Sequence, residues 1–250
     1  MRTKLLVGNW KMNKTRAEAL QFAKASVELL KFAQSKNVQI GVTPPYLSLD
    51  LVKSTNPKLI VGAQNVHYKE AGAFTGEISI PMLKELGIDW SLVGHSERRS
   101  YYGETNASCN EKVLALLNNK MTPLYCVGET LTQFEAGQTK AIVEAQVREG
   151  LRGVSQDDAL KLVIAYEPVW SIGTGKNASK EIAEDVCAFI RNILSDLFGA
   201  ASKKIQILYG GSVKPNNIKE YMAETNIDGA LVGGASLDVD SFKQLIENID

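Results

Sequence analysis

Eight short apolar segments recur along the chain at intervals of about thirty residues, and this repeat constrains the fold more than any other feature. The segments are nearly continuous in apolar residues, which is typical of strands buried on both faces of a parallel sheet. Helical patterns of apolar residues lie between them. The eight segments occupy residues 4–7, 38–42, 59–63, 91–93, 123–127, 162–166, 205–209 and 229–232.

Strands that alternate with helices eight times predict an α/β protein built as a (β/α)8 barrel, with a doubly wound open sheet as the alternative. The chain has 250 residues, 44% of them hydrophobic, and is long enough to bury a full core. No Pro/Gly-rich linker divides it. We therefore expect residues 1–250 to form a single domain.

Four helices can be placed from the sequence. Thr15 and Glu18 have the spacing of a capping box at a helix start. A second helix is expected from about Ser179, and others over 106–117 and 138–151. The buried face of the first helix is expected at Leu20, Ala23, Val27 and Leu30.

Composition excludes several classes of partner. The chain has 28 Lys+Arg and 28 Asp+Glu, without a basic stripe, which argues against nucleic-acid binding. The first apolar run is too short for a signal or membrane segment, so we expect a cytoplasmic protein without a membrane partner. Three cysteines without metal-like spacing and only two histidines predict reduced thiols and neither metal nor cofactor.

Polar and glycine residues follow the apolar segments, and in a barrel these positions converge on the face where active sites lie. Glu167 follows the sixth segment, directly before Pro168, which ends the strand. A glycine-punctuated segment with Ile172 near its tip comes next. A carboxylate on a rigid strand end beside a movable segment suits proton abstraction in a site that opens and closes.

Other strand ends supply groups that complement a base. His95 precedes a helix start, and a helix N-terminus disfavours imidazolium, so we expect a neutral ring. Lys11 adds a positive charge, and glycine pairs at 210–211 and 233–234 expose N–H groups that can bind phosphate. Taken singly, these features also fit a solvated carboxylate, a satisfied core histidine, a surface lysine and ordinary turns.

Eight motifs in order along the whole chain resemble the triosephosphate isomerase family. The resemblance implies a TIM barrel without cofactors and the interconversion of dihydroxyacetone phosphate and glyceraldehyde 3-phosphate through an enediolate, in glycolysis and gluconeogenesis. The family is itself the standard example of a glutamate base beside a neutral histidine. The motifs are GNWKMN (8–13), TPP (43–45), GAFTGEIS (72–79), VGHSERR (93–99), CVGE (126–129), AYEPVWSIGTGK (165–176), YGGSV (209–213) and DGALVGGASL (228–237).

The resemblance assigns roles residue by residue. Glu167 would carry the proton, His95 and Asn9 would polarise the substrate oxygens, and Lys11 would offset negative charge. Glu97 would order Lys11. Phosphate binding would fall to Gly173, Ser212, Gly233 and Gly234, and loop closure would involve Ile172, Leu231 and Tyr209.

The family also implies a homodimer, in which the loop 72–79 inserts Thr75 beside Asn9 and Lys11 of the partner subunit. Ser171, where the family more often has alanine, and Asn177 in the rear hinge are slight departures that affect loop motion. Two competing functions remain open: a barrel that acts on a larger sugar phosphate, and a phosphate-binding scaffold without catalysis. The short loops after the first and seventh segments disfavour the former, and the presence of Glu167, His95 and Lys11 disfavours the latter.

Overall fold

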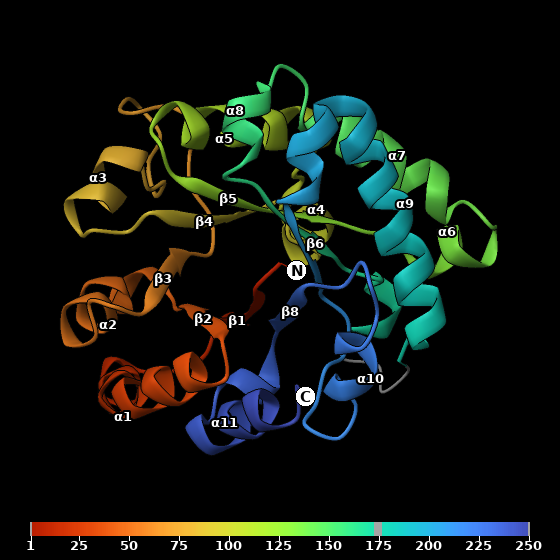
Figure 1. Ribbon diagram of the computed structural model, residues 1–250. Helices are drawn as coiled ribbons and strands as arrows, with labels where there is room; N and C mark the ends of the chain where they lie inside the picture. The colour runs from red at the N-terminus through yellow and green to blue at the C-terminus, as the bar shows by residue number, and fades with distance from the viewer. Residues whose placement is uncertain (1, 173–176, 250) are drawn as a thin grey trace.

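Eight parallel strands close into a barrel that is surrounded by helices (Figure 1), in a computed structural model that describes residues 2–172 and 177–249. Each strand pairs with its sequence neighbours, and β1 also pairs with β8, which closes the ring. The predicted (β/α)8 or TIM barrel is confirmed, and the open sheet was wrong. The strands are β1 (Lys4–Asn9), β2 (Val38–Thr43), β3 (Ile60–Ala63), β4 (Trp90–Val93), β5 (Thr122–Val127), β6 (Val163–Tyr166), β7 (Gln206–Tyr209) and β8 (Gly229–Val232).

The helices cover the outside of the barrel (Figure 1), and the predicted helices over 106–117 and 138–151 are α5 and α7. None of the described helices has the length and apolar character needed to span a membrane. The α-helices are α1 (Arg16–Ser35), α2 (Leu49–Thr55), α3 (Ile80–Glu85), α4 (Ser96–Tyr102), α5 (Asn106–Asn118), α6 (Leu131–Glu135), α7 (Thr139–Gly150), α8 (Gln156–Ala159), α9 (Lys180–Phe198), α10 (Ile218–Met222) and α11 (Val239–Glu247). Short 3-10 helices are η1 (Tyr46–Ser48), η2 (Val169–Ser171), η3 (Gly199–Lys203) and η4 (Gly234–Ser236).

Helix starts were predicted correctly, but one buried face was not. The Thr15–Glu18 capping box opens α1, and the Ser179 side chain caps α9. On α1 the predicted face was wrong at Val27, which is 37% exposed. Phe22 sets the actual face, because its ring packs edge-on against Trp10 at 4.9 Å between centroids. The buried residues are Ala19, Phe22, Ala23, Ser26, Leu29, Leu30 and Ala33.

The core has two layers, as both faces of the sheet are covered. Most buried apolar side chains lie between the strands and the helices, and a smaller cluster fills the barrel interior. All three cysteines are buried free thiols, as predicted. The interior cluster comprises Leu5, Val7, Leu92, Leu124, Cys126, Val163, Ala165, Leu208 and Leu231.

Candidate active site

A cavity of about 900 Å³ opens at the carboxyl ends of the strands. It is lined from four directions: the end of β1, the β4–α4 turn, the end of β6, and the turns after β7 and β8. The cavity size falls in the range of small-molecule sites. Gly173 lies outside the described residues. The candidate residues on the wall of the cavity are Asn9, Lys11, His95, Glu167, Ile172, Ser212, Leu231, Gly233 and Gly234.

Glu167 is held in place by two hydrogen-bond donors. Its Oε1 lies 2.9 Å from Nε2 of His95, and its Oε2 accepts the backbone N–H of Ser96 at 2.9 Å. Burial raises the pKa of the Glu167 carboxyl, but the His95 ring and the Ser96 N–H outweigh it, so the pKa lies below its ordinary value. Gly210 forms the adjoining wall, where a Cβ would approach Cγ of Glu167 to 2.8 Å. These contacts stabilise the ionised form of Glu167, so in this arrangement it is a weaker base than a free carboxylate.

His95 is the N-cap residue of α4, as its position before a helix start predicted. Its Nδ1 accepts the backbone N–H of Glu97 at 3.2 Å, so this nitrogen carries no proton. A neutral ring then bears its proton on Nε2, toward Glu167. Burial lowers the pKa of His95, whereas the charge and hydrogen bond of Glu167 raise it above the ordinary value. This direction is opposite to the lowering expected from the helix N-terminus alone, because the facing carboxylate favours imidazolium.

Lys11 has an unusual backbone conformation that local hydrogen bonds maintain. Its φ is 51°, which is uncommon for a residue with a side chain. Its N–H donates to Oδ1 of Asn9 at 3.0 Å, and its Nζ lies 2.5 Å from Oε1 of Glu97. Nε2 of Gln64 donates to the Lys11 carbonyl at 2.8 Å and to that of Thr43 at 2.9 Å. Gln64 directly follows the third apolar segment but was not predicted as a site residue.

The turns after β7 and β8 expose backbone donors toward the cavity. The N–H groups of Ser212, Gly233 and Gly234 make no hydrogen bond to another part of the described chain. Gly234 begins η4, and a Cβ there would meet nothing within 4 Å. At Gly233 a Cβ would lie 3.7 Å from Cε of Lys11, so the lysine side chain runs beside this turn. Free N–H groups next to an ammonium group suit a phosphate.

Tyr209 lies at the base of the segment that follows Glu167. Its hydroxyl is buried and finds no hydrogen-bond partner among the described residues. Its ring stacks on Tyr221 with centroids 4.3 Å apart, and the Tyr221 hydroxyl donates to the carbonyl of Ala178 at 2.7 Å. At the front of the segment, Nε1 of Trp170 donates to Oε1 of Glu129 at 2.8 Å.

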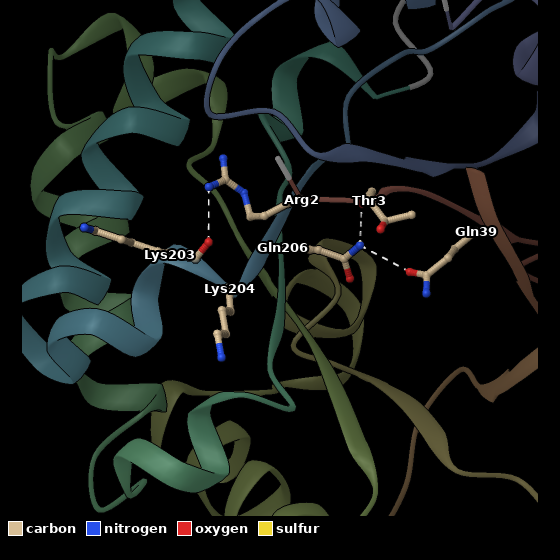
Figure 2. A pocket seen from close by; sticks show the side chains of 6 residues that line it. All are labelled: Arg2, Thr3, Gln39, Lys203, Lys204 and Gln206. Atoms are coloured by element: carbon tan, nitrogen blue, oxygen red, sulfur yellow. Dashed lines mark hydrogen bonds between the residues drawn. The ribbon is translucent and has the colours of Figure 1, made fainter. Parts of the chain in front are cut away.

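A second hollow, of about 440 Å³, lies at the opposite, amino end of the strands. Figure 2 shows the amines of Lys203 and Lys204 extending away from each other, and the Gln206 amide turned toward Thr3 and Gln39. The Arg2 guanidinium is engaged by Asp228 and by backbone carbonyls. The basic groups therefore do not converge on a common point, unlike those of the first cavity.

The fold and the first cavity define an enzyme of the (β/α)8-barrel class, with a carboxylate, an imidazole and turns that carry backbone N–H groups, unpaired within the described chain, on one cavity wall. The family model described as Triosephosphate isomerase matches residues 4–249. The chain belongs to the triosephosphate isomerase family, as the motifs predicted, and is an isomerase.

Curated relatives agree over nearly their whole length. The triosephosphate isomerase of Carboxydothermus hydrogenoformans is 49% identical over 250 residues, which cover 99% of each chain. That of Caldanaerobacter subterraneus subsp. tengcongensis is 48% identical over 251 residues, covering 98% of this chain and 99% of the relative. That of Moorella thermoacetica is 47% identical over 248 residues, covering 98% of each.

Proposed function

We propose that this protein interconverts dihydroxyacetone phosphate and D-glyceraldehyde 3-phosphate in glycolysis and gluconeogenesis. The observation that carries the proposal is the facing pair Glu167 and His95, 2.9 Å apart, in one cavity with Lys11 and the exposed N–H groups. The two substrates differ only in which of two adjacent carbons bears the carbonyl. The reaction needs one base that reaches both carbons and one group that passes the hydroxyl proton between the two oxygens.

In the proposed reaction, Glu167 removes a proton from the carbon next to the carbonyl and returns it to the neighbouring carbon. The Nε2–H of His95 and the amide of Asn9 hydrogen-bond the oxygens on which negative charge develops. Nε2 of His95 gives its proton to the former carbonyl oxygen and takes the hydroxyl proton of the neighbouring oxygen, so that one proton moves between the carbons and one between the oxygens. The Lys11 ammonium stabilises the enediolate and the phosphate. A substrate oxygen that replaces Glu167 as the acceptor of the His95 proton also removes a donor that lowers the carboxyl pKa. Substrate binding thus strengthens the base at the moment it is needed.

Phosphate binding is proposed for the backbone N–H groups of Ser212, Gly233 and Gly234, with Gly173 as a further candidate from the sequence. The N–H groups of Ser212, Gly233 and Gly234 make no hydrogen bond within the described chain, and Gly233 lies beside the Lys11 side chain. These groups and Glu167 line the same cavity, so a small substrate with its phosphate on these turns can present its carbon atoms to the base.

A coupled assay with D-glyceraldehyde 3-phosphate tests this function. We expect turnover without added metal or cofactor, since the proposed steps use only the protein's own groups. A parallel assay with pentose and hexose phosphates is the specificity control. Absence of turnover with the triose phosphate, or comparable turnover with a larger sugar phosphate, would contradict the proposal.

We also propose that residues 168–178 form a lid over the cavity, with Ile172 and Leu231 excluding water from Glu167. The unpaired hydroxyl of Tyr209 is the supporting observation. A buried donor without a partner costs about 1–3 kcal/mol, and a second conformation that provides an acceptor would recover that free energy. Ser171 and Asn177 lie within the lid and would affect its motion. A closed lid would supply the missing acceptor.

Tyr209→Phe tests the lid. The variant should be at least as stable to heat as the parent protein, since it removes a buried hydroxyl that makes no hydrogen bond in the present conformation, and should lose turnover by at least about fivefold. Calorimetry and steady-state kinetics measure the two effects, and Tyr221→Phe, which removes the bond to Ala178, should instead lower stability. Unchanged turnover in Tyr209→Phe would rule out the closing contact.

A homodimer located in the cytoplasm, with neither nucleic acid nor membrane as a partner, completes the proposal. The balanced charge, without a basic stripe, supports the expectation that nucleic acid is not a partner.

A further inference from the structure

The β4–α4 turn, residues 94–96, carries two groups of the proposed site, and its backbone is held at Gly94 on both sides of the residue. It presents the His95 imidazole and the Ser96 N–H, both of which contact Glu167. The N–H of Gly94 donates to the buried Glu104 carboxylate at 3.0 Å. The carbonyl of Gly94 accepts Nε–H of Arg99 at 2.8 Å. Glu104 therefore holds the peptide before Gly94, and Arg99 holds the peptide between Gly94 and His95.

Arg99 uses its guanidinium to join this turn to the neighbouring elements. Besides the Gly94 carbonyl, it donates to Oδ1 of Asn106 on α5 at 2.8 Å. On β5 it donates to the Tyr125 hydroxyl at 3.1 Å and to the Cys126 carbonyl at 3.3 Å. All four acceptors are uncharged, and no carboxylate pairs with Arg99 in the described parts of the chain. The side chain thus makes a directed, multidentate contact that a simple ammonium cannot reproduce.

The packing around Gly94 leaves little room for movement. Gly94 has φ 73°, a left-handed conformation that favours glycine. A Cβ at this position would lie 2.9 Å from Nη2 of Arg99 and 2.9 Å from Sγ of Cys109. The guanidinium is therefore in direct contact with the turn at Gly94, one residue before His95.

We propose that Arg99 is a positioning residue for the isomerisation: its contact with the Gly94 carbonyl fixes the turn that aims Nε2 of His95 and the Ser96 N–H at Glu167. The inference rests on the proposed roles of His95 and Glu167. Arg99 does not line the main cavity and touches no reacting atom. Its contribution is geometric, and misplacement of a catalytic group by about 1 Å can cost about 10²-fold in rate.

Arg99→Lys tests the proposal, because it keeps the positive charge and loses the planar, forked set of N–H donors of the guanidinium (the fork). We expect kcat to fall about 10- to 100-fold with KM changed less than about threefold, since the proposed phosphate-binding groups lie on the turns after β7 and β8 and not on this turn. The His95 ring resonances should shift in NMR spectra, which are simple to assign because the chain has only two histidines.

Arg191→Lys is the matched control. Arg191 likewise donates to backbone carbonyls, those of Ser202 and Ile205, and pairs with Asp228, but at the amino end of the barrel. The Arg191→Lys variant should be less stable, while its kcat and its His95 resonances stay as in the parent protein. An equal loss of kcat in both variants would mean that Arg99 acts through general stability, and would overturn the proposal.

Chemical rescue keeps the test informative if Arg99→Lys folds poorly. A hollow of about 340 Å³ is lined in part by Arg99 and Ser96, so a small cation can enter the space left in Arg99→Ala. Millimolar guanidinium should restore kcat at least severalfold, and methylammonium, which lacks the fork, should not. No rescue, or equal rescue by both cations, would count against directed positioning.

The proposed function and this inference fail on different results. If Glu167→Gln and His95→Gln keep normal turnover, the proposed function fails. If these two variants lose turnover and Arg99→Lys does not, only this inference fails.

Discussion

Glu167→Gln should lower turnover by roughly 10²–10⁴-fold, because a positioned general base typically contributes that much to a proton transfer. The corresponding increase in the activation free energy is about 3–5 kcal/mol. Glutamine keeps the size of the side chain and can still accept the Ser96 N–H, so the fold and substrate binding should be retained. Steady-state kinetics with purified variant measures the effect, and KM should change far less than kcat.

Glu184→Gln is the control for this substitution. Glu184 is a partly buried carboxylate that accepts hydrogen bonds from Asn226 and does not line the cavity. Its replacement should leave turnover unchanged. Near-normal turnover in Glu167→Gln would remove this residue from the role of base.

The same variant has a second readout in the titration of His95. In the parent protein the Glu167 carboxylate raises the pKa of the ring, against the lowering effect of burial. In Glu167→Gln the raising charge is gone, while burial and the Glu97 N–H remain. The pKa of His95 should therefore fall below its parent value, so that the ring stays neutral to lower pH. An NMR titration in which the pKa of His95 is unchanged or higher would contradict the observed pairing.

The barrel could be predicted from the sequence because its signal is local and repeated. Each apolar segment is long enough for one strand, and the residues between two segments are enough for one crossover helix. Because successive strands usually lie next to each other and such crossovers are right-handed, the order of the strands in the barrel follows. Residues at strand ends, such as Asn9, His95 and Glu167, then converge without any knowledge of side-chain contacts.

What could not be predicted depends on contacts between distant segments. The buried face of α1 depends on Trp10, which lies outside the helix and draws Phe22 inward. Gln64 supports Lys11 across 53 positions of sequence, and no local pattern marks that bond. The net pKa direction of His95 likewise follows from its facing carboxylate, whereas the sequence showed only the nearby helix start.

The loop 72–79 should control assembly, and its disruption is the second large effect expected. Residues 71–77 are exposed, including Phe74 at 41%. The turn is braced at its base, where the N–H of His67 donates to the carbonyl of Ile78 at 2.8 Å and the His67 ring packs on Phe74 with centroids 4.2 Å apart. An ordered projection with an exposed aromatic ring is typical of an interaction surface.

The same chain also offers a recess for such a loop. A hollow of about 150 Å³ lies beside the cavity, lined in part by Lys11, Gln64 and Glu97. At its edge Met12 is 96% exposed and Tyr102 is 69% exposed. A projection and a recess on one chain can satisfy each other across a twofold axis, as an isologous dimer requires. The loop of one subunit would then pack against the segment that holds Lys11 in the other.

Thr75→Arg places charge and bulk at the loop tip, and we expect it to produce monomers with turnover lowered by about 10²-fold, because the strained Lys11 segment loses its covering partner. Sedimentation and activity are measured together over a range of protein concentrations. Activity per subunit should rise as the protein is concentrated, since mass action restores the dimer. Leu160→Arg, at an exposed apolar residue beyond α8, is the control and should remain dimeric and active. A monomeric Thr75→Arg protein with full activity at all concentrations would show that catalysis does not depend on assembly, and the contact between the loop and the Lys11 segment would then serve stability alone.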